Sequence, residues 1–231
     1  MKKISGKALL ASLVLAVSIA NANNISKYVG VKGNYGVVTK DESCTDCINP
    51  TFNPAGVGLG FGIKNNADGG IFVGVEGYLN YALNEPEEII GEEYYYPNES
   101  EKYIARLNMG FSFEINTLVG LNIGEHLNIY ALVGLIRTKP RFEWDYQYSV
   151  GSYSETEIDV VDIEAKSNIS PQLGIGVGFN ASNNLSIKLQ YTLSKPKYNV
   201  IISSRLIPGY SERYITNFAN NNISLSINRA F

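Results

Sequence analysis

The strongest constraint on the fold is an alternation of period two that runs from Tyr103 to Ile123. Every second residue of this stretch is apolar or aromatic except Thr117, and the residues between them are mostly polar or glycine. Successive side chains of a strand point to opposite faces, so the pattern predicts one long strand. A helix would need apolar residues three and four positions apart, which this stretch lacks.

The same alternation recurs in seven further segments. They are residues 28–38, 55–63, 71–83, 127–135, 169–179, 185–193 and the closing 223–231. In the clearest of them, Ala55, Val57, Leu59, Phe61 and Ile63 alternate with four glycines. The connections between the eight segments are alternately long and short. Outer-membrane barrels have an even number of strands, short turns at the periplasmic end and long loops outside, so the connections support the same fold.

The first 22 residues have the parts of a secretory signal. Three lysines are followed by an apolar stretch from Ala8 to Ala20, and the small residues Ala20 and Ala22 flank Asn21 at a cleavage site. The apolar stretch is too short for a membrane anchor. We therefore expect a mature domain of residues 23–231, with 16 basic against 22 acidic residues and a net charge of −6. Nucleic acid is not an expected partner, because no basic face is clustered.

The two faces of the strands separate a membrane barrel from a soluble, lipocalin-like carrier. A narrow lumen accepts glycine and serine but cannot hold eight strands of Leu, Ile and Phe. The bulky residues must therefore face outward, and a soluble protein could not expose so much apolar surface. We predict an all-β, eight-stranded, antiparallel up-and-down transmembrane β-barrel in the outer membrane of a Gram-negative bacterium. Outer-membrane lipid and lipopolysaccharide are its expected surroundings.

Strand character continues beyond membrane height in residues 103–111, 142–148 and 198–202. This predicts strand extensions above the membrane. The apolar parity also switches at Pro140, where a bulge or bend is expected because proline cannot donate a ladder hydrogen bond.

The signal, the eight strands, the glycine alternation and the terminal Phe231 together resemble the small OmpA/OmpX-type outer-membrane barrels over the whole mature chain. In that family the barrel assembly machinery reads a terminal aromatic residue with apolar residues at alternate positions before it. The resemblance thus implies an assembly signal at Ile223, Leu225, Ile227 and Phe231. Arg229 departs from the pattern, although near the interface its head can reach water. The resemblance also implies surface adhesion or contact with a host or matrix protein.

Five charged residues are predicted to point into the lumen: Lys32, Glu76, Arg106, Glu114 and Lys188. Isolated buried charges are costly, so we expect them to be paired. The strand between those of Lys32 and Glu76 carries only glycine on its inner face, which leaves room for a pair across it. A structural polar plug is the favoured interpretation, and an ion-conducting gate is the alternative.

Other chemistry-bearing residues are few. Cys44 and Cys47 lie in the first outer loop, where a local disulfide is expected in an exported protein. Two ligands make a poor zinc site, and no metal or cofactor is predicted. His126, the single histidine, falls in a periplasmic turn, whereas membrane-barrel hydrolases place their histidines near the outer rim. We therefore predict that the protein is not an enzyme, with a carboxylate-only site as the open alternative.

The second long loop is acidic and rich in tyrosine. Exposed aromatic residues are favoured at interfaces, and strands above the membrane offer edges to a partner strand. The predicted contact surface comprises Glu92, Glu93, Tyr94, Tyr95, Tyr96 and Trp144. A solvated loop, or one that meets divalent cations at the lipopolysaccharide surface, is the alternative. The favoured function is a non-enzymatic surface protein for envelope structure and adhesion, against a small pore or a lipid-acting barrel enzyme.

Overall fold

A computed structural model describes residues 25–40, 50–66, 70–96, 99–150, 159–165, 168–203 and 211–231. The predicted signal and the pair Cys44 and Cys47 lie outside these ranges, so both remain predictions. Among the residues that are described, no helix is long and apolar enough to cross a membrane.

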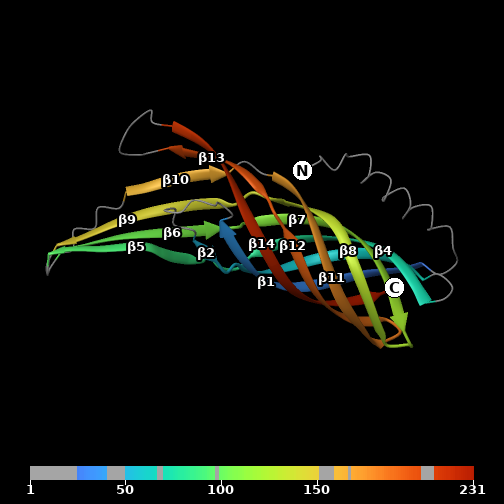
Figure 1. The fold of residues 1–231 in the computed structure, drawn as a ribbon. Coiled ribbons are helices and arrows are strands. Elements are labelled where there is room, and N and C mark those ends of the chain that lie inside the picture. The colour runs from blue at the N-terminus through green and yellow to red at the C-terminus, as the bar shows by residue number, and fades with distance from the viewer. Residues whose placement is uncertain are drawn as a thin grey trace.

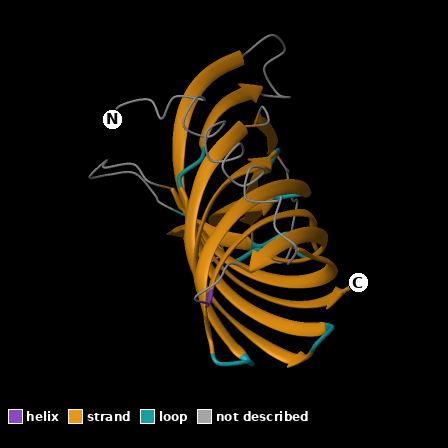
Figure 2. Cartoon of the chain, turned by 90° about the vertical axis from the view of Figure 1, so that its right-hand side faces the viewer, coloured by secondary structure: helices purple, strands orange, loops and turns teal. Residues whose placement is uncertain are grey.

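Eight of the described strands form a closed antiparallel barrel (Figures 1 and 2). In order around the barrel they are β1 (Ile25–Lys40), β3 (Ala55–Asn66), β4 (Ile71–Ala82), β7 (Phe111–Ile123), β8 (Leu127–Thr138), β11 (Asn168–Ser182), β12 (Leu185–Ser194) and β14 (Ser211–Ala230). The barrel closes because β1 also pairs with β14, with Val31 opposite Ile227. The predicted fold class is therefore confirmed.

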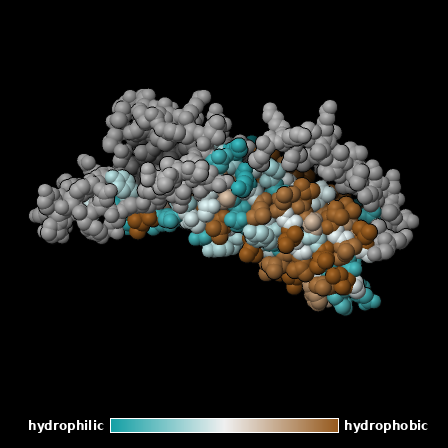
Figure 3. All heavy atoms as spheres, in the orientation of Figure 1, coloured by the Kyte–Doolittle hydropathy of each residue, from teal (hydrophilic) through white to brown (hydrophobic). Residues whose placement is uncertain are grey.

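The apolar parity of the barrel strands faces outward, as predicted. Leu59 and Phe61 of β3 are 68% and 66% exposed, and apolar residues of the other barrel strands are exposed as well. In the view of Figure 3, hydrophobic side chains gather over the barrel. The inward parity carries Asn, Ser, Gln, charged residues and glycine. These glycines make room for aromatic side chains, because a Cβ at Gly60 would collide with the ring of Tyr78. The lumen thus holds larger side chains than the prediction of glycine and serine allowed.

A second sheet continues from the barrel beyond the end opposite the carboxyl terminus (Figure 1). Next to β14 come β13 (Lys197–Ser203), β10 (Asp159–Ala165), β9 (Arg141–Val150), β6 (Glu99–Asn108) and β5 (Glu87–Tyr96), in that order. The short β2 (Thr51–Phe52) pairs with β1. The predicted strand extensions above the membrane are confirmed.

The polarity of the two faces inverts where the second sheet begins. A cluster of buried apolar residues, which we call the rim core, fills the inside of this region: Val38, Phe52, Ala105, Leu107, Phe142, Tyr198 and Phe218. The rings of Phe142 and Phe218 stack with centroids 4.9 Å apart. Outside the membrane the surrounding solvent is water, so burying apolar side chains inside becomes favourable. Apolar side chains therefore face outward in the membrane part of the barrel and inward above it.

The prediction of one unbroken strand from Tyr103 to Ile123 is wrong. The strand is interrupted at Met109 and Gly110, where Gly110 has a φ of +55°. Leu107 is fully buried and Phe111 is 64% exposed, although the two have the same parity in the sequence. The interruption moves the chain from the second sheet into the barrel and swaps its faces. The break predicted at Pro140 is confirmed, since β8 ends at Thr138 and β9 begins at Arg141.

We expect Gly110→Ala to lower the free energy of unfolding by about 1–2 kcal/mol, because a Cβ is strained at positive φ. Urea unfolding of the refolded protein in detergent measures this change. Gly33→Ala is the matched control, because nothing lies within 4 Å of the added Cβ and its φ is not positive. Equal stability of Gly110→Ala and Gly33→Ala would contradict the role given to Gly110.

Candidate functional site

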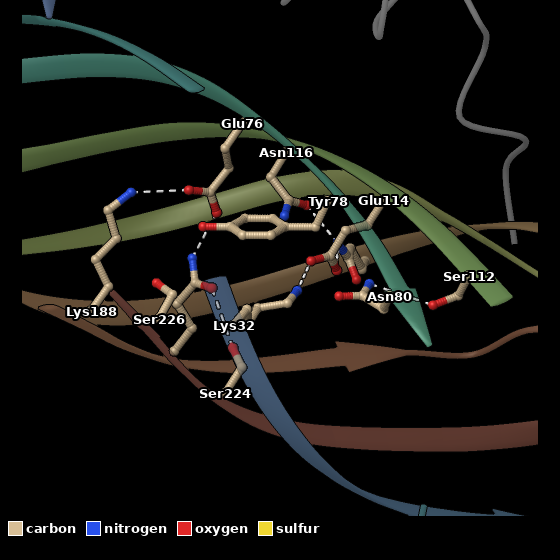
Figure 4. Close-up of polar contacts among 12 residues, drawn as sticks. Lys32, Glu76, Tyr78, Asn80, Ser112, Glu114, Asn116, Lys188, Ser224 and Ser226 are labelled. Atoms are coloured by element: carbon tan, nitrogen blue, oxygen red, sulfur yellow. Dashed lines mark hydrogen bonds and ion pairs between the residues drawn. The ribbon is translucent and has the colours of Figure 1, made fainter. Parts of the chain in front are cut away.

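Four strands bring charged side chains together in the middle of the lumen. Lys32 comes from β1, Glu76 from β4, Glu114 from β7 and Lys188 from β12, and all four are buried. The register places both lysines beside the same residue of β14, Ser226. The two glutamates lie on the adjacent strands β4 and β7, so lysines and glutamates face each other across the interior (Figure 4). We call these four residues and their polar neighbours the lumen plug.

Glu76 accepts three hydrogen bonds in the plug. Its carboxylate lies 3.0 Å from Nζ of Lys188, 2.8 Å from Nε2 of Gln190 and 3.1 Å from the hydroxyl of Tyr28. The ammonium of Lys188 also donates to that hydroxyl at 2.9 Å and lies 4.2 Å from the centre of the tyrosine ring. A fully buried carboxylate is tolerated when its charge and lone pairs are satisfied in this way.

Lys32 and Glu114 form the second ion pair of the plug. The ammonium of Lys32 lies 4.3 Å from the centre of the Tyr78 ring, a distance suited to a cation–π contact. Nε2 of Gln172 donates to Glu114 at 3.3 Å and to Asn116 at 2.5 Å. The positive and negative charges cancel within each of the two ion pairs, so the plug fits a neutral structural filling of the lumen.

The partners within the plug differ from those expected. The sequence predicted space for an ion pair between Lys32 and Glu76. Instead, Lys32 pairs with Glu114 and Glu76 pairs with Lys188. β4 and β12 are four strands apart in a barrel of eight and therefore lie on opposite sides. In so narrow a lumen, side chains meet across the interior rather than along the wall.

Arg106 was predicted to belong to this cluster, and that prediction is wrong. The residue lies on β6 of the second sheet, and its Nε is 3.2 Å from a carboxylate oxygen of Glu87 on β5. The interruption at Gly110 removes Arg106 from the barrel, which the continuous parity of the sequence concealed.

Cavities lie on both sides of the plug. A small polar one of about 60 Å³ lies between Lys32 and the outer rim, and one of about 440 Å³ lies at the periplasmic end below Lys188. The rim core stands above the small cavity, where the hydroxyls of Thr138 and Tyr198 lie 2.5 Å apart. Burial raises the pKa of Tyr198 to about 12, so this phenol remains protonated at neutral pH.

The chain matches the family model described as the outer membrane protein beta-barrel domain over residues 8–231. It belongs to that family. No curated protein matches the chain.

Solved outer-membrane proteins are similar to this family member at low identity. The attachment invasion locus protein Ail of Yersinia pestis is 13% identical, with 90% of this chain and 99% of that chain covered and a TM-score of 0.46. Neisserial surface protein A is 10% identical, with 90% and 100% covered and a TM-score of 0.46. The outer membrane protease OmpT of Escherichia coli is 8% identical, with 91% and 98% covered and a TM-score of 0.43.

The predicted assembly signal has the geometry that the resemblance implied. Ile223, Leu225 and Ile227 all point outward from β14, and Phe231 beyond it is 79% exposed. Arg229 shares this outward parity. Recognition by the barrel assembly machinery remains a prediction.

The predicted outer contact residues lie on the second sheet. The backbone of Glu92, Glu93, Tyr94, Tyr95 and Tyr96 belongs to β5, and that of Trp144 belongs to β9. Their side chains lie outside the described part of the structure, so the contact role remains a prediction.

Two further predictions concern metal binding and the position of His126. No group of three potential ligands for a metal ion occurs among the residues that the structure describes. His126 lies in the turn between β7 and β8, with Nδ1 3.2 Å from the carbonyl oxygen of Asn180.

The residues of the rim core were missed by sequence reasoning. Phe142, Tyr198 and Phe218 were available as a signal, because each is an aromatic residue five to seven positions from a barrel segment. Their parity in β9, β13 and β14 is the one that faces the inside.

Proposed function

We propose that this outer-membrane barrel is a non-enzymatic surface protein that contacts an external partner through its second sheet. The observation that carries the proposal is the rim core, which gives the region above the membrane a packed interior of its own. A packed interior of this kind holds the strands of the second sheet in fixed positions. Binding to a preformed surface costs less conformational entropy than binding to a loop that must first be ordered.

The strand β5 is the proposed contact edge. It ends the strand order and forms a ladder with β6 alone among the described strands, while β2 contacts it through a hydrogen bond from the backbone N–H of Thr51 to the carboxylate of Glu88. No described strand forms a ladder with the second edge of β5, and a partner strand is proposed to add there. Glu85, Glu87 and Ile89 are exposed along or next to this strand. The acidic side chains favour a partner with a basic, extended segment and oppose pairing with a second copy of the same edge.

The small-pore alternative is opposed by the lumen plug, whose two ion pairs occupy the interior between the two cavities. Planar-bilayer recording of the refolded protein tests it. Steady unit conductance would support the pore and count against the proposed role. The enzyme alternative is opposed by the place of His126, which lies at the end opposite the second sheet.

We expect Glu87→Lys to reduce the binding of cells that display the barrel to host cells or matrix proteins by about tenfold, because it reverses a charge on the contact edge. Glu125→Lys is the matched control, since it changes the net charge equally in a periplasmic turn. Heat-modifiable gel mobility checks that both variants fold. Equal binding by the two variants, or no binding by the unsubstituted protein, would overturn the proposal.

A further inference from the structure

The periplasmic end of the lumen contains a cavity that the proposed function does not use. Its volume of about 440 Å³ falls within the range of about 300–1,000 Å³ that is usual for small-molecule sites. Glu125 and His126 of the β7–β8 turn and Asn183 of the β11–β12 turn line its mouth. Tyr28 and Lys188 of the lumen plug line its inner end. The cavity therefore ends at the plug instead of continuing as a passage.

Lys64 of β3 is half-buried in the wall of this cavity. Its Nζ donates to Oδ1 of Asn122 at 3.0 Å and lies 3.9 Å from the centre of the Phe72 ring. Within the described ranges no carboxylate lies at ion-pairing distance from Lys64, in contrast to Lys32 and Lys188. A partly desolvated ammonium without a counter-ion is costly, and an anion bound in the cavity would offset that cost.

The cavity has walls of two different kinds. Phe72, Leu118 and Tyr130 form an apolar wall, in which the rings of Phe72 and Tyr130 meet edge to face with centroids 6.2 Å apart. The described lining also includes hydroxyls and amides, and Glu125 at the mouth is the one acidic residue among the described lining residues. A ligand suited to both walls carries a negative charge at one end and an apolar body at the other.

We propose that this cavity binds a small carboxylate with an apolar body, which enters from the periplasmic side. The carboxylate accepts a hydrogen bond from Nζ of Lys64 and neutralises its charge. The apolar body packs against Phe72 and Tyr130. The site lies at the opposite end of the barrel from the β5 edge, so it does not depend on the proposed contact function.

Isothermal titration of the refolded protein in detergent micelles tests the proposal, with benzoate as the probe and empty micelles as the blank. We expect saturable binding of benzoate to one site and binding about tenfold weaker for benzamide, its neutral counterpart. Inorganic phosphate, which has the charge without the apolar body, should also bind about tenfold more weakly than benzoate.

Three variants place the binding at Lys64. Lys64→Gln should weaken benzoate binding about tenfold, whereas Lys64→Arg should keep most of it. Lys27→Gln should bind like the unsubstituted protein, because Lys27 is exposed on the outside of β1 opposite Ile63. No saturable binding of benzoate, equal binding of benzamide, or equal binding by Lys64→Gln would overturn the proposal. Equal binding of phosphate would overturn the ligand class. The comparison among the three probes uses the unsubstituted protein and does not depend on the folding of any variant.

Discussion

Glu76→Ala is expected to lower the free energy of unfolding of the barrel by about 3–5 kcal/mol, the cost of removing one partner from a buried ion pair. Glu76 has no exposed surface and accepts hydrogen bonds from Lys188, Gln190 and Tyr28. The substitution leaves the ammonium of Lys188 buried without its counter-ion. It also leaves two further donors without their acceptor.

Urea unfolding of the refolded protein in detergent measures this loss. Glu76→Gln should cost less than Glu76→Ala, because the amide oxygen still accepts hydrogen bonds although the charge is gone. Glu87→Ala is the control for loss of a carboxylate from an exposed ion pair, and its effect should remain within about 0.5 kcal/mol. If Glu76→Ala were as stable as Glu87→Ala, the plug would not be the structural element described here.

The second large effect is expected on the outer face. Leu59 lies near the middle of β3 with 68% of its surface exposed. In a bilayer that surface meets acyl chains, where an arginine near the midplane of a barrel costs about 2–4 kcal/mol. Leu59→Arg should therefore destabilise the barrel in lipid by this amount, whereas Leu59→Phe should leave its stability nearly unchanged. Folding and unfolding of the variants in lipid vesicles measure the difference.

A soluble protein would respond differently to Leu59→Arg. In a soluble protein, replacing an exposed leucine with arginine is harmless and increases solubility. Tolerance of Leu59→Arg without loss of stability in vesicles would therefore contradict a lipid-facing surface on β3.

The barrel could be predicted from the sequence because all of its membrane-spanning strands alternate apolar residues with small or polar ones. Each strand has acyl chains on one side and a tight lumen on the other, so the alternation of Val57, Leu59 and Phe61 with glycine determines both the strand and its outward face. Above the membrane this orientation reverses, because water replaces lipid. The alternation through Leu107 and Phe111 continues across the boundary, while Gly110 exchanges the two faces. The pattern alone could not reveal that exchange.

Four of the five charged residues predicted for the lumen do lie there, whereas Arg106 does not, and the ion pairs could not be predicted. Lys32, Glu76, Glu114 and Lys188 stand at inward parity, and their burial follows from that position. Their partners depend on which strands lie opposite each other, a property of the closed barrel. The cavity at Lys64 depends on inward aromatic residues such as Phe72, for which neighbouring glycines make room.

The orientation of the apolar residues can be measured directly with a spin label at position 59. Cys44 and Cys47 are first replaced by serine, a single cysteine is introduced by Leu59→Cys, and the labelled protein is reconstituted in lipid bilayers. Collision rates with oxygen and with a water-soluble nickel complex then report the surroundings of the label. We predict frequent collisions with oxygen and few with nickel, as for a side chain in the acyl-chain region. A label open to nickel, or one shielded from both reagents inside the protein, would contradict a barrel whose apolar face meets the membrane.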